Sequence, residues 1–364
     1  MLFLLGRRLF DRKTSLLASY LLAVSTSSIY YSQYARPYSM VVCFVLLSFL
    51  SFLKALEKNT LYPWALYTAV TLFALLLSAS ALPVLICQAL FLVISWRHYK
   101  GGFNPKRAIV SFSLITIAYL PFLLRVFLPN IENGKVRPLS WLPLPSLGTL
   151  VNIFDIFAGK LVIDDVAYTP ASGLSLFRGV FGALLFLLCL LGLFSAFRAG
   201  RSGPDEEAAF PLSGAFLSSW LIIPLALPAV FSYFFSPVFG EVRYVLYLAP
   251  AYYLLASRGI MSLGRRARIL AFACLCLAGL LFLREYYRVE KRTNWRQICS
   301  YIKDNIKDDE KTAFMPYRNM QEYLVLSYYQ APSLIALIAE GELEKPAIME
   351  QIYDNPVKVC KVEE

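Results

Sequence analysis

The sequence predicts an all-α, polytopic membrane protein with a small α/β segment at its C-terminal end. Hydrophobic residues make up 58% of the 364 residues and charged residues only 16%, whereas a soluble domain carries about 25% charged residues. The mean hydropathy is +0.57. The net charge of +11 is spread over alternate loops between apolar runs, which is typical of membrane topology and unlike the basic stripe of a nucleic-acid-binding protein. We therefore expect a multi-pass protein of the cell inner membrane or plasma membrane with no nucleic-acid partner.

The apolar runs predict about nine complete membrane-spanning helices after a stub, residues 1–5, that is too short to cross a bilayer. The expected spans are residues 14–28, 38–53, 61–77, 81–95, 108–128, 174–197, 212–231, 243–256 and 269–283. Several are shorter than the roughly 20 residues that a span needs, which predicts tilt or local thinning of the bilayer. Lys and Arg cluster in the loop at 7–13 and in every second loop after it. The positive-inside rule then places the turn at 29–37 and the C-terminal segment outside the cytoplasm.

Two regions are therefore expected, a transmembrane domain at 1–284 and an extracytoplasmic segment at 285–364. The first contains a long external loop, 129–174, in which residues 146–160 have apolar side chains at helical spacing and Ser146 at the capping position. We interpret these residues as a helix that lies in the membrane interface. The second region is polar, has mixed charge and lacks a spanning run, and we expect it to be a small, incomplete α/β segment.

The turn at residues 29–38, which reads I-Y-Y-S-Q-Y-A-R-P-Y, gathers unusual side chains between two apolar runs. Arg36 is the only charged residue between Lys13 and Lys54, and a lone charge beside hydrocarbon is costly. Pro37 disfavours helix at Arg36 and suits the first turn of the next helix, so we expect Arg36 at the mouth of that helix, where it can hold an anion. The alternative is that the turn is a belt of aromatic and arginine side chains that anchors the helix ends.

The run Tyr31–Ser39 resembles the Y-S-Q-E-A-R-P-Y-A signature of the bacterial protein-mannosyltransferase-like family, whose members are integral-membrane glycosyltransferases with the GT-C fold. Three weaker motifs recur in the family's order, namely Gly6–Arg12, Arg243-Tyr244 with Pro250, and Asn294–Arg296. The likeness covers nearly the whole chain and implies a donor in which the sugar is attached to a polyprenyl phosphate. One departure is Tyr34, which stands where the family usually has Glu.

The resemblance implies a donor-binding surface at the outer face of the membrane. Its expected members are Tyr31, Gln33, Arg36, Tyr38, Arg243 and Tyr244. Arginine suits phosphate because its planar guanidinium bonds two oxygens at once. Arg36 and Arg243 are both expected at outer helix ends beside tyrosine, and for each of them interfacial anchoring is the alternative.

Transfer of a sugar also needs a base for the acceptor hydroxyl. In the family this base is an Asp in the first external loop. The resemblance places that loop before Met1, so we expect the sequence to be N-terminally incomplete. The acids expected outside before the C-terminal segment are Glu132, Asp155, Asp164, Asp165 and Glu241. Asp155, on the interfacial helix, is the best local candidate for a catalytic role, and the alternative is a solvated acid on the polar face of that helix.

The chain has a single histidine, His98, and no Gly-rich phosphate loop, which argues against serine–histidine catalysis and fits a lipid-linked donor. No metal ligands or cofactor are predicted, although a divalent metal is compatible with the chemistry. We expect a polyprenyl-phosphate-sugar-dependent hexosyl- or pentosyltransferase that serves a glycan, lipid or protein acceptor at the outer face of the cytoplasmic membrane. The alternative is a non-catalytic degenerate paralogue or a carrier for lipid-linked sugars, and membrane lipids are partners in either case.

Overall fold

The structure is a computed structural model, and it describes ten stretches of the chain. These are residues 1–34, 36–95, 105–127, 144–160, 162–163, 166–167, 174–199, 212–234, 239 and 242–288. All of them belong to one unit, Met1–Val289. The predicted C-terminal segment lies outside the described residues from position 289 onward. The expected division into two domains therefore stays a prediction.

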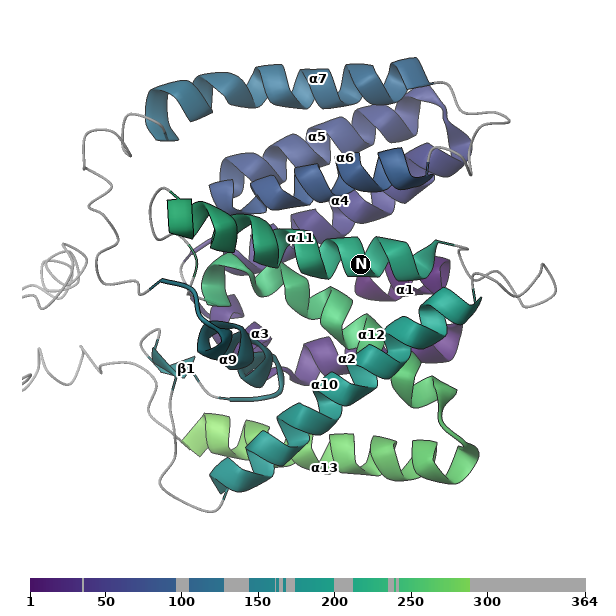
Figure 1. The fold of residues 1–364 in the computed structure, drawn as a ribbon, viewed down its shortest axis with the longest axis vertical. Coiled ribbons are helices and arrows are strands. Elements are labelled where there is room, and N and C mark those ends of the chain that lie inside the picture. The colour runs from purple at the N-terminus through teal and green to yellow at the C-terminus, as the bar shows by residue number, and fades with distance from the viewer. Residues whose placement is uncertain are drawn as a thin grey trace, which may run out of the picture. The chain divides into compact units, whose positions relative to one another are not determined.

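Five helices are long and apolar enough to cross a membrane. They are α4 (Tyr38–Lys58), α7 (Pro105–Phe122), α10 (Leu174–Ala199), α11 (Ser213–Phe234) and α13 (Arg265–Arg288), and α7 continues as the π-helical turn η2 (Leu123–Phe127). α4 is largely enclosed, whereas α7 and α13, at opposite edges of Figure 1, leave most of their apolar surface uncovered. An apolar surface of this extent fits contact with lipid. A helical membrane protein is thereby confirmed, while the count of nine spans stays a prediction.

Shorter elements connect and support these helices. They are α1 (Leu2–Leu9), α2 (Arg12–Val24), α3 (Thr26–Ser32), α5 (Leu61–Leu77), η1 (Ala79–Ala81), α6 (Leu82–Ser95), α9 (Leu147–Phe157), η3 (Val242–Tyr244), η4 (Leu246–Leu248) and α12 (Ala249–Ser262). Two strands, β1 (Val162–Ile163) and β2 (Val166–Ala167), pair antiparallel between α9 and α10 in the sequence. Helices therefore form the fold, and the strand pair is a local feature.

The predicted span at residues 14–28 is divided in the structure. α2 ends at Val24, and the backbone of Ser25 is extended. The side-chain hydroxyl of Ser25 accepts a hydrogen bond from the backbone N–H of Ser28. Serine side chains compete with the helical hydrogen bonds and are favoured as N-caps, so the run of hydroxyl residues at 25–28 starts a new helix instead of continuing the old one. At 13 residues, α2 by itself is too short to cross a bilayer.

The predicted span at residues 243–256 also differs from the structure. The chain enters it through the two 3-10 turns η3 and η4, and α12 begins only at Ala249. Pro250 lies in the first turn of α12, where its missing N–H would have no helical partner in any case. Arg243 and Tyr244 are therefore presented by a tight turn before the helix and not by the helix itself.

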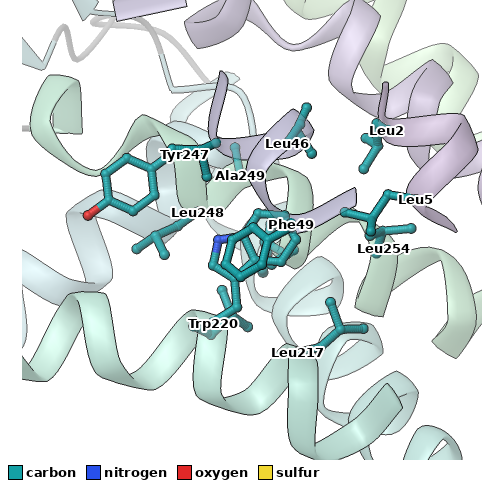
Figure 2. Close-up of a cluster of buried hydrophobic side chains, with 14 of the residues drawn as sticks. Leu2, Leu5, Leu46, Phe49, Leu217, Trp220, Tyr247, Leu248, Ala249 and Leu254 are labelled. Carbon is teal, nitrogen blue, oxygen red and sulfur yellow. The ribbon is translucent and has the colours of Figure 1, made fainter. Parts of the chain in front are cut away.

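The core lies where α1, α4, α11 and the η4–α12 segment meet. Figure 2 shows Phe49 of α4 against Trp220 of α11, and their ring centroids are 4.1 Å apart. Leu5 of α1 and Leu254 of α12 complete the cluster, and all four side chains are fully buried. This packing also fixes η4, whose Leu248 belongs to the same cluster, against α4.

α10 and α12 pack with their backbones in direct contact. A Cβ atom added at Gly192 would lie 1.8 Å from the carbonyl oxygen of Leu255, and one added at Gly259 would lie 1.9 Å from that of Leu188. Small residues allow membrane helices to approach this closely and to gain van der Waals contact. The crossing fixes the course of α10, whose N-terminal turns reach the polar region described below.

Candidate functional site

Four tyrosine rings pack together where α3 leads into α4, and we call Tyr30, Tyr31, Tyr34 and Tyr38 the tyrosine cluster. The ring centroid of Tyr31 lies 5.1 Å from that of Tyr30 and 5.4 Å from that of Tyr38, edge to face in both pairs. This is a favourable aromatic geometry. The ring of Tyr34 lies 5.6 Å from that of Tyr30. The cluster thus fixes the turn that carries four of the six predicted donor-binding residues.

Arg36 is exposed at the N-terminal end of α4, where Pro37 is the N-cap residue. Its Nη1 atom lies 3.4 Å from the hydroxyl oxygen of Tyr38, which is at the long end of a hydrogen bond. The helix N-terminus adds its own partial positive charge at this place. The predicted position of Arg36 at the mouth of the helix is confirmed, and its guanidinium is accessible to an anion.

Gln33 joins the tyrosine turn to α13, the last helix that the structure describes. Its side-chain oxygen accepts a hydrogen bond of 2.8 Å from the hydroxyl of Tyr286, which lies near the C-terminal end of α13. Tyr286 is buried, whereas Gln33 is exposed. Sequence reasoning did not find this contact, because the two residues are 253 positions apart and Tyr286 belongs to no recognised motif.

The predicted interfacial helix is α9, and its predicted cap is confirmed. The hydroxyl of Ser146 accepts a hydrogen bond from the backbone N–H of Thr149, whose side chain in turn accepts one from the backbone N–H of Ser146. Ile153, Ile156 and Phe157 form the buried face of the helix, whereas Leu147 remains 82% exposed. An 11-residue helix of this kind is too short to span a bilayer, and it leaves apolar side chains uncovered for an interface.

Asp155 is half-buried on α9 and faces α10. A Cβ atom at Gly182 would lie 3.1 Å from the Asp155 Oδ1 atom, so the absence of a side chain there makes room for the carboxylate. Burial raises the pKa of the Asp155 carboxyl above its ordinary value, and the positive charge of Lys160 opposes this by a smaller amount. The Lys160 ammonium donates a hydrogen bond of 2.9 Å to the side-chain oxygen of Asn152. Asp155 is therefore a more basic carboxylate than a solvated one.

Tyr253 of α12 holds α9 next to the start of α3. Its hydroxyl donates a hydrogen bond of 2.7 Å to the carbonyl oxygen of Phe157. Because that hydroxyl has one proton, the 2.9 Å contact with Ser25 has the serine hydroxyl as donor. Ser25 is the N-cap of α3, the helix that leads into the tyrosine cluster. The structure thus brings the helix of Asp155 and the tyrosine turn to the same region.

Arg243 and Tyr244 form a second group. The guanidinium of Arg243 lies over the ring of Tyr244, 5.1 Å from its centroid, and both side chains are half-buried on η3. The following turn, η4, contacts α4. The pair is therefore positioned by a turn that packs on α4, the helix that begins next to Arg36.

One charged pair was missed by sequence reasoning. Arg178 of α10 forms an ion pair with Glu285 of α13, and only 7% and 15% of these side chains are exposed. The signal that marked Arg36 was present here as well, because Arg178 is the only charged residue between Asp165 and Arg198. Arg178 falls inside an apolar run that is typical of a membrane span, and the sequence does not show that a carboxylate on a distant helix meets it there.

Of the five acids expected outside before the C-terminal segment, the structure describes Asp155 alone. Glu132, Asp164, Asp165 and Glu241 lie outside the described residues. Within the described ranges, no group of three or more His, Cys, Asp or Glu side chains is arranged to hold a metal ion. Asp155 is therefore the one member of this set of five whose surroundings the structure describes.

No protein-family model, no curated protein and no solved structure matches this chain. The fold by itself defines the class, a helical membrane protein with at least five helices capable of crossing a bilayer. Any finer assignment depends on the side chains described above.

Proposed function

We propose that this protein is a GT-C-type membrane glycosyltransferase. It moves a hexosyl or pentosyl group from a polyprenyl phosphate to a glycan, lipid or protein acceptor at the outer face of the cytoplasmic membrane. The proposal includes nine spans with the tyrosine turn outside the cytoplasm and an extracytoplasmic C-terminal α/β segment. It is supported by the resemblance at residues 31–39 and by the geometry of the tyrosine turn.

The observation that carries the proposal is the position of Arg36. An exposed guanidinium at the N-terminus of a membrane helix, held beside the buried ring of Tyr38, can bond two oxygens of a phosphate while the helix dipole adds to the attraction. Such a cation stabilises the negative charge that collects on the phosphate as it leaves the sugar. The donor lipid would then lie along the apolar surface of the helices with its phosphate at the turn.

Asp155 is the described carboxylate that fits the base. Transfer breaks the bond between the anomeric carbon and the phosphate oxygen and forms one between that carbon and the acceptor oxygen. The proton of the acceptor hydroxyl passes to the base, and polyprenyl phosphate leaves as an anion. A raised pKa makes Asp155 a better proton acceptor near neutral pH, and attack from the face opposite the phosphate inverts the anomeric carbon.

Donor binding tests the role of Arg36. We expect Arg36→Ala to weaken binding of a polyprenyl-phosphate sugar by roughly tenfold or more, because a charge-assisted, bidentate contact is lost. Arg36→Lys should recover part of it, since lysine keeps the charge without the planar fork. The matched control is Arg125→Ala, which removes another exposed arginine at the end of a spanning helix. Equal binding by Arg36→Ala and the wild type would reduce Arg36 to an interfacial anchor.

Turnover tests the role of Asp155. Sugar release from a labelled lipid donor, in the presence of a membrane extract as acceptor, should fall by about 10²-fold or more in Asp155→Asn, which keeps the size of the side chain but cannot take the proton. Glu57→Gln is the control and should retain activity, because Glu57 lies at the C-terminal end of α4, away from the end next to Arg36.

Tyr34 favours the second candidate, a non-catalytic carrier, because a neutral phenol stands where the resemblance implies a carboxylate. Donor binding without any turnover by the wild type would select the carrier.

A further inference from the structure

The ion pair of Arg178 and Glu285 lies where the N-terminal turns of α10 cross the C-terminal turns of α13 (Figure 1). The Arg178 Nη2 atom donates a hydrogen bond to Glu285, and the guanidinium lies over the ring of Phe282, 5.5 Å from its centroid. The same ring fills the space above Gly159, whose backbone φ of +108° few other residues adopt. The end of α9, the first turns of α10 and the last turns of α13 therefore meet at this guanidinium.

The hydrogen-bonding capacity of Arg178 is largely unused. A guanidinium carries five N–H groups and stays charged at any physiological pH. Glu285 accepts from Nη2 alone, and the described residues offer no partner to the buried Nε and Nη1 atoms. Buried donors are nearly always paired in folded proteins, so an unpaired set on a side chain that is more than nine-tenths buried needs an explanation.

The ion pair lies at one end of two helices that are apolar enough to cross a membrane, since Arg178 is in the second turn of α10 and Glu285 is in the last turn of α13. Both helices leave most of their apolar surface uncovered, and Leu176, Val180 and Leu280 are 76%, 53% and 64% exposed. These three side chains face lipid on the sides of the helices that point away from Arg178. The ends of spanning helices lie at the depth of the lipid headgroups, so a lipid that packs against this crossing brings its anionic group to the level of the unpaired donors.

We propose that Arg178 is the binding residue for the phosphate group of a membrane lipid at the crossing of α10 and α13. Its Nε and Nη1 atoms donate to the phosphate oxygens, and Glu285 is a positioning residue that holds the guanidinium through Nη2. The lipid chains lie against the exposed apolar side chains of the two helices. The site uses none of the residues of the tyrosine turn, so it stands whether or not the protein transfers sugars.

A purely structural ion pair makes the opposite prediction for the two partners. If the pair only joins two helices, removing either charge leaves the other buried and unpaired, and both single variants are damaged alike. If Arg178 binds a phosphate, the two substitutions change lipid binding in opposite directions. Loss of the arginine removes the binding group, whereas loss of the carboxylate removes a charge that repels the phosphate.

The test uses the full chain in neutral detergent and measures lipid binding by native mass spectrometry. The probe is phosphatidic acid, and diacylglycerol of the same chain length reports binding that needs no phosphate. We expect Arg178→Gln to weaken phosphatidic acid binding by about tenfold, and Glu285→Gln to bind at least as tightly as the wild type. Arg284→Gln removes the exposed arginine next to Glu285 and should change little.

Folding is controlled with the double variant Arg178→Gln/Glu285→Gln, which leaves no unpaired buried charge. It should be as stable to heating as the wild type and should fail to bind the lipid. Unchanged binding in Arg178→Gln, or equal weakening in Arg178→Gln and Glu285→Gln, overturns the proposal. Competition by inorganic phosphate identifies the source of the anion. Displacement of the lipid at millimolar phosphate would replace the lipid ligand with a soluble one and overturn that part of the proposal.

Discussion

Two sets of buried polar side chains in this protein differ in whether their hydrogen-bonding groups have partners. Inside the bundle, Tyr67 donates a hydrogen bond of 3.0 Å to the side-chain oxygen of Gln88, whose nitrogen donates one of 2.9 Å to Ser48. Ser48 is in turn bonded to Thr71 at 2.7 Å. Near α9 and α10, by contrast, two buried nitrogen atoms of Arg178 have no described hydrogen-bond partner. The buried hydroxyl of Tyr252 has none either.

The difference separates structural polarity from functional polarity. The first set joins α4, α5 and α6 and has every hydroxyl and amide engaged, as expected of polar groups that hold membrane helices together. The second set leaves donors unused in a region that also contains Asp155, a carboxylate whose pKa is raised by burial. Buried donors without a partner cost stability and call for an explanation, which for Arg178 is the phosphate proposed above.

The largest expected effect is on the bundle network. Gln88→Leu removes the residue that bonds both Tyr67 and Ser48, and we expect the free energy of unfolding to fall by about 1–3 kcal/mol because each of these two buried groups loses a hydrogen bond. Thermal unfolding in detergent measures it. Thr116→Val is the control and should have a smaller effect, since the Thr116 hydroxyl is exposed and bonds the carbonyl oxygen of Phe112 in its own helix. A loss no larger than that of the control would show that the network is not structural.

Two tyrosines test the comparison directly. Tyr67→Phe removes a bonded hydroxyl and should reduce the free energy of unfolding by about 1 kcal/mol. Tyr252→Phe removes a buried hydroxyl that has no described partner, so it should be neutral or stabilising. The measurement is the same unfolding experiment on both variants. Similar losses in the two would mean that the Tyr252 hydroxyl is engaged and that the two polar sets do not differ.

The smallest effect concerns the pH dependence of Asp155. Its pKa is raised on folding, so between the ordinary and the raised value the folded state binds more protons than the unfolded state. The free energy of unfolding should therefore decrease as the pH rises through that interval. Asp155→Asn should remove this part of the slope, as measured by unfolding temperatures over the acidic range. An identical slope in the variant would show that Asp155 is solvated in the folded protein.

Features that depend on neighbours in the chain were predictable. The apolar runs predicted a helical membrane protein, Ser146 predicted the start of α9, and Pro37 predicted the start of α4 next to Arg36. Each of these follows from a preference of one residue for its own backbone or for an environment. The division at Ser25 was missed because Ser and Thr also occur inside membrane helices, where their hydroxyls can bond a carbonyl of the preceding turn. The run of hydroxyl residues at 25–28 therefore does not show by itself whether the helix continues or a new one starts.

The sequence by itself therefore determined the class of the protein, the five long apolar helices and the residues of the tyrosine turn. Tertiary structure alone decided which of those residues meet. Gln33 meets Tyr286 across 253 positions, and Arg178 meets Glu285 across 107. The physical reason is that helix propensity and hydrophobicity act within a few turns, whereas the pairing of two side chains on distant helices depends on how the helices cross. For example, Gly192 of α10 and Gly259 of α12 set the crossing of those two helices. Because glycine has no side chain, the sequence gives no sign of this contact.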